Sequence, residues 1–169
     1  MKTFTLYRAN CKGNKKNTTY NNKCVVSSMK ALKEVVLFDH VGCEYKNNHR
    51  AKEDFISADV VMMDLDNGHS DDPDEWKTLD DVAEAFPDVD FCYIESRHHM
   101  MPKTTDKGEI KEPRPKYHLY FPIEKTSDPK EYEQIKGQIG AIFPYFDGRC
   151  KDIAHFFYAV PEAKGGVYK

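Results

Sequence analysis

The sequence predicts an α+β fold. Two observations support this: apolar runs typical of strands alternate with segments of helical spacing, and the two kinds of segment follow no regular strand-helix-strand repeat. With 169 residues, of which 40% are hydrophobic and 12% aromatic, the chain can enclose one core. No linker and no internal repeat divides it, so we expect residues 1–169 to form one domain.

The clearest expected strand covers residues 58–65. Its centre, 60–63, reads Val-Val-Met-Met, and Asn67-Gly68 ends the run. Continuous apolar character over this length is typical of a central strand covered on both faces. The other expected strands are 3–9, 91–95 and 116–123.

Helices are expected where a capping residue precedes a helical spacing of apolar residues. Asp128 followed by Pro129 is a strong start of this kind, because proline suits the first helical position. The expected helices are 27–37 (capped by Ser27 or Ser28), 78–86 (capped by Thr78), 128–142 and a last piece at 151–158. The polar segments 10–23 and 97–115 are expected to be loops.

Composition bounds the class of protein. No stretch approaches the roughly 20 apolar residues that a membrane-spanning helix needs, and the N-terminus lacks the apolar core of a signal peptide. A membrane partner is therefore not expected, and a cytoplasmic location is.

The cysteines fit a reducing compartment, because they are odd in number, widely spaced and without a Cys-x-x-Cys pair. They are Cys11, Cys24, Cys43, Cys92 and Cys150. A zinc site built from Cys11, Cys24, His40 and Cys43 is the alternative, but the spacing matches no standard finger. Idle or buried thiols are favoured.

Charge is unevenly distributed although the formal net charge is only −3. No acidic residue precedes Glu34, whereas this region carries eight basic ones: Lys2, Arg8, Lys12, Lys15, Lys16, Lys23, Lys30 and Lys33. Such a segment could face phosphates. A solvated basic surface remains the alternative.

Asp64-Leu65-Asp66 ends the central strand. Since strand side chains alternate, both carboxylates project from one face, roughly 7 Å apart at their Cα atoms. Their repulsion is most simply relieved by a divalent cation. The alternative is a turn at Asp66-Asn67-Gly68. An EF-hand does not fit, because its sixth position would be His69 rather than glycine.

A second group of candidates is basic. Lys116 and His118 share one face of the strand 116–123, which suits a nucleotide polyphosphate. Arg97, His99 and Lys103 in the preceding loop could add donors. A packed surface histidine is the alternative for His118.

A third candidate is Asp147, which the aromatic segment 144–146 delivers just before a basic stretch. Asp147 or Asp152 could complete a metal site with the first two aspartates. The alternative is a turn or helix-capping role.

In this order, Asp-x-Asp, Lys-x-His and hydrophobic-Asp resemble the three motifs of the archaeo-eukaryotic primase superfamily. The resemblance is closest to the primase-polymerase domains of phage and plasmid replication proteins and covers about residues 59–161. The first third of the chain is placed in that domain only by position.

The resemblance implies a fold and a set of roles. The fold would be a sheet platform of RNA-recognition-motif type beside a second α/β unit, with the site in the cleft between them. Asp64, Asp66 and Asp147 would be catalytic ligands of two Mg²⁺ or Mn²⁺ ions in a two-metal mechanism, and His118 would contact nucleotide phosphate. Two positions depart from the family pattern: Lys116 stands where serine is frequent, and His155 where a basic arginine is common.

The implied activity is that of a nucleotidyltransferase, a DNA primase or polymerase that joins NTP or dNTP to a 3′-hydroxyl on a single-stranded DNA template. A helicase, downstream in a longer replication protein or separate, is the implied partner. Two rival functions remain. A rolling-circle endonuclease would need a His-hydrophobic-His pair, and a binding module without turnover would be expected to lack an acid.

Overall fold

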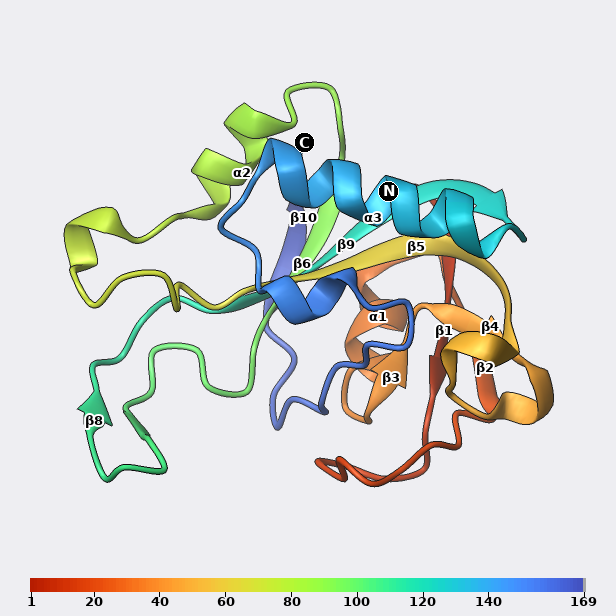
Figure 1. Ribbon diagram of the computed structural model, residues 1–169, viewed down its shortest axis with the longest axis horizontal. Helices are drawn as coiled ribbons and strands as arrows, with labels where there is room; N and C mark the ends of the chain where they lie inside the picture. The colour runs from red at the N-terminus through yellow and green to blue at the C-terminus, as the bar shows by residue number, and fades with distance from the viewer. Residues whose placement is uncertain (169) are drawn as a thin grey trace.

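The computed structural model describes residues 1–168 and has the predicted α+β class. Its centre is a five-stranded antiparallel sheet that carries two helices on one face and a smaller sheet with a short helix on the other (Figure 1). No helix in this part of the chain is long and apolar enough to cross a membrane.

The large sheet has the strand order β10-β6-β9-β5-β4. Its two central strands are long: β5 pairs antiparallel with β9 and places Asp64 opposite His118. The bounds are β4 Cys43–Tyr45, β5 Phe55–Leu65, β6 Phe91–Glu95, β9 Tyr117–Thr126 and β10 Gly165–Tyr168. The central strand predicted at 58–65 is therefore confirmed, and its middle is buried as expected.

Helices α2 (Leu79–Ala85) and α3 (Pro129–Ile142) cover one face of this sheet (Figure 1). Both predicted starts are confirmed: Thr78 forms a capping box, and the Asp128 side chain accepts from the N–H of Lys130. Phe121 of β9 packs on this side, with its ring centroid 5.3 Å from that of Phe86.

The smaller sheet has the order β2-β1-β3, with β1 Phe4–Arg8, β2 Asn22–Val26 and β3 His40–Val41, and it is joined by α1 Met29–Val35. It lies against the face of the large sheet opposite to α2 and α3. Phe4 stacks on Tyr120 of β9 at 6.1 Å, and the His40 ring hydrogen-bonds the same tyrosine. The side chains of Asp64 and His118 point to this face, because they alternate with the helix-facing residues of their strands.

Several predictions at the level of single elements were wrong. The helix expected at 151–158 is absent: a 3₁₀ turn covers Gly148–Lys151, and the chain then runs extended past His40, with which Phe157 exchanges backbone hydrogen bonds. The loop 97–115 contains a two-stranded hairpin, β7 Lys103–Thr104 and β8 Ile110–Lys111. Further 3₁₀ turns lie at Lys46–Asn48, Lys52–Asp54 and Pro73–Glu75.

Candidate functional site

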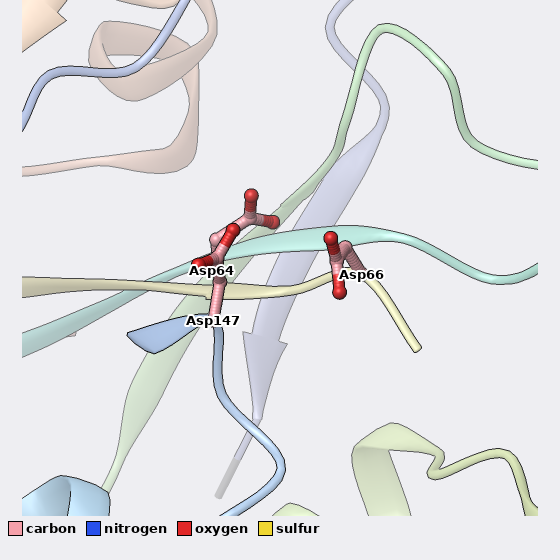
Figure 2. Close-up of side chains that lie close together, drawn as sticks. All are labelled: Asp64, Asp66 and Asp147. Atoms are coloured by element: carbon pink, nitrogen blue, oxygen red, sulfur yellow. The ribbon is translucent and has the colours of Figure 1, made fainter. Parts of the chain in front are cut away.

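Three carboxylates meet at the end of β5. Asp64, Asp66 and Asp147 each offer a ligand oxygen, and these oxygens lie within 4.8 Å of one another. Figure 2 shows the side chains of Asp64 and Asp147 close together, and that of Asp66, two residues after Asp64, further from them. No other group of three or more His, Cys, Asp or Glu side chains with metal-binding spacing occurs in residues 1–168. The Asp64-Leu65-Asp66 motif and Asp147, which lie about 80 residues apart in the sequence, thus form one cluster.

Asp147 reaches Asp64 along an open edge of β5. Strand β4 pairs only with the first residues of β5, so the later backbone groups of β5 need other partners. The segment after α3 supplies them: the N–H of Asp147 donates to the carbonyl of Asp64 at 2.8 Å, and the N–H of Asp64 donates to Sγ of Cys150 at 3.2 Å. This pairing fixes the third acid beside the first.

Asp64 is the least satisfied acid of the cluster. Its Oδ1 is buried and has no hydrogen-bond partner among residues 1–168. Burial, together with the charges of Asp66 and Asp147, raises the pKa of Asp64 to about 7. A divalent cation would neutralise three acids at once and use the free oxygen, so the residues present fit Mg²⁺ or Mn²⁺, which prefer oxygen ligands.

Asp147 is held ionised by Arg149. The Arg149 Nε lies 2.9 Å from Oδ2 of Asp147, and the backbone N–H of Arg149 donates to Oδ1 of the same carboxylate. Burial alone would raise the pKa of Asp147, but the hydrogen bonds from Arg149 outweigh it and lower the pKa. His155 does not supply this positive charge, because burial and the nearby Lys136 lower its pKa to about 4.

His118 lies beside Asp64 on the neighbouring strand but is more deeply buried than a simple phosphate contact would be. Its ring stacks on Phe157 with centroids 4.0 Å apart, and it is 6% exposed. Burial and the charges of the surrounding basic groups lower its pKa well below the ordinary value, so the ring is neutral at neutral pH. Nδ1 is buried without a partner in the described residues.

A cleft of about 160 Å³ opens over this cluster. Its lining residues are Asp64, Asp66, Ser96, Arg97, His98, Lys103, Lys116, His118, Arg149 and Tyr158. The lining combines acidic side chains, Asp64 and Asp66 (the acidic wall), with basic ones, Arg97, Lys103 and Lys116 (the cationic wall). Since small-molecule pockets typically measure about 300–1,000 Å³, an occupant the size of a nucleotide would extend beyond the cleft.

The cationic wall contains Arg97, Lys103 and Lys116, three of the residues predicted to contact nucleotide. Burial, followed by repulsion from other cations, lowers the pKa of Lys116, although Asp66 opposes this shift. His99 is the exception among the predicted contacts: its Nδ1 accepts from the N–H of Lys116 at 3.1 Å and its ring packs on Tyr117, away from the cleft lining. The adjacent His98 lines the cleft in its place.

Neither of the other sequence alternatives forms a metal site. The Asp152 carboxylate accepts from the N–H of Ala154 and does not join the cluster. For the zinc alternative, both ring nitrogens of His40 are engaged, Nδ1 with the carbonyl of Phe38 and Nε2 with the hydroxyl of Tyr120. All five cysteines are free, as the sequence favoured.

Asn67 was missed as a site residue. It directly follows Asp66, is fully buried and has a left-handed backbone with φ of 52°. Its side chain donates to the carbonyls of Lys77 and Pro115 and accepts from the N–H of Lys77, while its own carbonyl accepts from buried Arg114. Because Pro115 precedes Lys116, Asn67 ties the acidic wall to the cationic wall. Asn-Gly marked only a turn in the sequence.

The chain matches no family model, no curated protein and no solved structure. The function is therefore argued from the geometry of this cleft and from the motifs that form it.

Proposed function

We propose that the chain is a metal-dependent nucleotidyltransferase of the primase-polymerase type. The observation that carries the proposal is the presence of two features at one cleft: three carboxylate oxygens within 4.8 Å of one another, and arginine and lysine side chains in the cleft lining. An acid cluster of this kind suits Mg²⁺ or Mn²⁺, and cations beside it suit the phosphates of an NTP or dNTP.

The roles follow from position. Asp64, Asp66 and Asp147 would hold the metal, which when bound aligns a 3′-hydroxyl with the α-phosphate and stabilises the leaving pyrophosphate. Lys103, Lys116 and Arg97 of the cationic wall would bind phosphate oxygens. His118 is buried and neutral, so it would help to position Asp64 on the neighbouring strand and could form a hydrogen bond through its ring nitrogen, but it would not supply a positive charge. Arg149 would exchange its contact with Asp147 for the incoming phosphates.

The order of elements supports the resemblance to archaeo-eukaryotic primases. Elements β5-α2-β6-β9-α3-β10 follow the βαββαβ chain order of ferredoxin-like units with both helices on one face, but β10 pairs with β6 rather than with β5, whose outer edge is taken in part by β4. The small sheet would then be the adjoining unit of the expected family core. Within that family a single-stranded DNA template and a helicase would be the partners.

One assay tests the proposal. Purified protein is incubated with single-stranded DNA, labelled nucleotides and Mn²⁺, and the products are resolved by length. Wild-type protein should extend or synthesise primers, whereas Asp64→Asn should lose at least about 10²-fold of the rate, the scale of removing a charge-stabilising group. Asp88→Asn, an exposed aspartate after α2, is the matched control and should retain activity.

The same assay separates the rival functions. Cleaved strands or a nicked plasmid, without extension, would identify an endonuclease, and Asp64-independent binding of DNA with no product would identify a module without turnover. Wild-type-like synthesis by Asp64→Asn would remove the acid cluster from the mechanism.

A further inference from the structure

A basic loop lies directly beside the candidate site. This loop, residues 10–17, leaves β1 and passes so close to the cleft that a Cβ on Gly13 would lie 3.5 Å from Nη1 of Arg97. Gly13 has a φ of +69°, a conformation that glycine adopts without strain. Because Arg97 lines the cleft, the loop continues its cationic wall toward the N-terminal sheet.

Asp39 fixes the position of this loop. Its buried carboxylate accepts from the N–H groups of Gly13 at 2.7 Å and Asn14 at 2.8 Å, and from the N–H of Ala159 at 2.8 Å. Ala159 follows Tyr158, which lines the cleft. One side chain therefore holds both the basic loop and the residue next to a cleft aromatic, so the loop is an ordered neighbour of the site rather than a free arm.

The loop presents its charges outward. Lys15 and Lys16 are the exposed central residues of a turn closed by a hydrogen bond from the N–H of Asn17 to the carbonyl of Asn14. Lys12 is also exposed and lies over the ring of Phe38 at 5.0 Å. No carboxylate occurs in the first 33 residues of the sequence, and the one that holds the loop, Asp39, is buried and accepts from backbone N–H groups.

Lys23 does not belong to the same surface. It lines a separate recess together with Tyr7, Asp59 and Lys125. Asp59 lies five residues before Asp64 on β5, or about 17 Å at the rise of a strand. The lysines of the acid-free segment are thus spread over several places, and those of the loop lie on the segment that approaches Arg97 of the cleft.

Between the loop and the acid cluster stands a stacked pair. The guanidinium carbon of Arg97 lies 3.9 Å from the ring centroid of Tyr158, and both residues are partly exposed in the cleft. Aromatic rings and arginine planes are the surfaces on which unpaired bases stack, whereas bases inside a duplex present no free face.

We infer that a single-stranded nucleic acid leaves the acidic site over the Arg97–Tyr158 pair and runs along loop 10–17, where Lys12, Lys15 and Lys16 contact its phosphates. The direction of the nucleic acid strand rests on the proposed function. The new element is the surface of the protein that binds the strand. The acid cluster repels a phosphate backbone, so the strand needs a cationic surface directly beside it, and this loop provides one.

The test is a salt titration of binding to labelled single-stranded DNA, in EDTA and without nucleotide, so that binding does not depend on the acid cluster. Each lysine-phosphate contact contributes about 0.7 to the slope of log affinity against log salt, so Lys15→Gln/Lys16→Gln should lower the slope by about 1.4. The matched control, Lys23→Gln/Lys30→Gln, removes the same charge elsewhere in the acid-free segment and should leave the slope unchanged.

Tyr158→Leu gives a second, independent measurement. It should weaken single-strand binding by about fivefold or more while keeping the salt slope, because it removes stacking and no charge. An unchanged slope in the loop variant, equal effects of the control pair, or binding that favours a duplex of the same sequence would each overturn the inference. None of these binding results tests nucleotide transfer. A wild-type protein that binds single-stranded DNA as described but transfers no nucleotide would overturn only the proposed function.

Discussion

Two aspartates of this chain, one fully buried and one partly buried, have opposite hydrogen-bonding environments. Asp39, under the small sheet, is fully buried and accepts three backbone N–H groups, with the thiol of Cys11 as a further donor at 3.6 Å. Asp64, at the end of β5, has a buried Oδ1 without any partner and two other acids beside it. One carboxylate is thus satisfied within the chain, and the other is not.

The difference separates a structural acid from a candidate functional one. A buried carboxylate that accepts several hydrogen bonds organises the chain around it, as Asp39 does for loop 10–17 and Ala159. A buried carboxylate among like charges costs stability unless something outside the chain neutralises it. Burial therefore does not by itself mark a candidate functional acid, whereas a lack of internal partners beside other acids does so for Asp64.

The largest expected effect is on the satisfied acid. Asp39→Ala would leave three partly buried N–H groups without their acceptor, so we expect the free energy of unfolding to fall by about 3 kcal/mol, roughly 1 kcal/mol for each lost hydrogen bond. Asp64→Asn in metal-free buffer should instead keep or raise stability, because it relieves repulsion. Chemical denaturation of both variants in EDTA measures these free energies of unfolding. Equal decreases in the two variants would show that the two aspartates do not differ in this way.

The second effect is the part of the pH dependence of stability that Asp64 causes. Its pKa is about 7 in the folded chain against an ordinary 3.8, so between these values the folded state holds a proton that the unfolded state has lost. Asp64 by itself therefore makes metal-free stability decline as pH rises from about 5 to 8, by about 2 kcal/mol. The rings of His40, His118 and His155 act in the opposite sense below pH 7, because burial lowers their pKa. These histidine contributions cancel between the two proteins, so the stability of the wild type minus that of Asp64→Asn should fall by about 2 kcal/mol over this range. Denaturation midpoints of both proteins across the pH range, in EDTA, measure the difference.

A smaller effect concerns Asn67, which joins the two walls of the cleft. Asn67→Gly keeps the left-handed backbone but removes three side-chain hydrogen bonds, so Mn²⁺ should bind about tenfold more weakly, the scale of losing a residue that supports metal ligands. Asn48→Gly has a comparable φ of 57° on the exposed surface and serves as control. Calorimetric Mn²⁺ titrations compare them, and equal affinities would reduce Asn67 to a turn residue.

The smallest effect sharpens the role of the charge beside Asp147. Arg149→Gln removes an internal competitor for the carboxylate, so Mn²⁺ should bind up to about fivefold more tightly, within the range of an exposed ion pair. Lys151→Gln changes the same charge without a contact to Asp147 and should have less effect. Weaker Mn²⁺ binding by the arginine variant would mean that Arg149 preorganises the site instead of competing for it.

The sequence by itself determined the parts that depend on short-range chemistry. Alternation on the central strand placed Asp64 and Asp66 on one face, and the capping residues Thr78 and Asp128 set the starts of both sheet-covering helices. The absence of acidic residues from the first 33 positions was also evident from the sequence. The sequence did not show that Lys23 lies in a recess apart from the lysines of loop 10–17.

Only the tertiary structure decided which distant segments meet. Asp147 joins the acids because β4 stops short and frees an edge of β5, and the helix expected at 151–158 gives way to backbone pairing of Phe157 with His40. The same packing buries His118 against Phe157 and turns His99 away from the cleft. Backbone groups at a sheet edge must find partners, and long-range pairing that satisfies them outweighs local propensity, which is all that a stretch of sequence expresses.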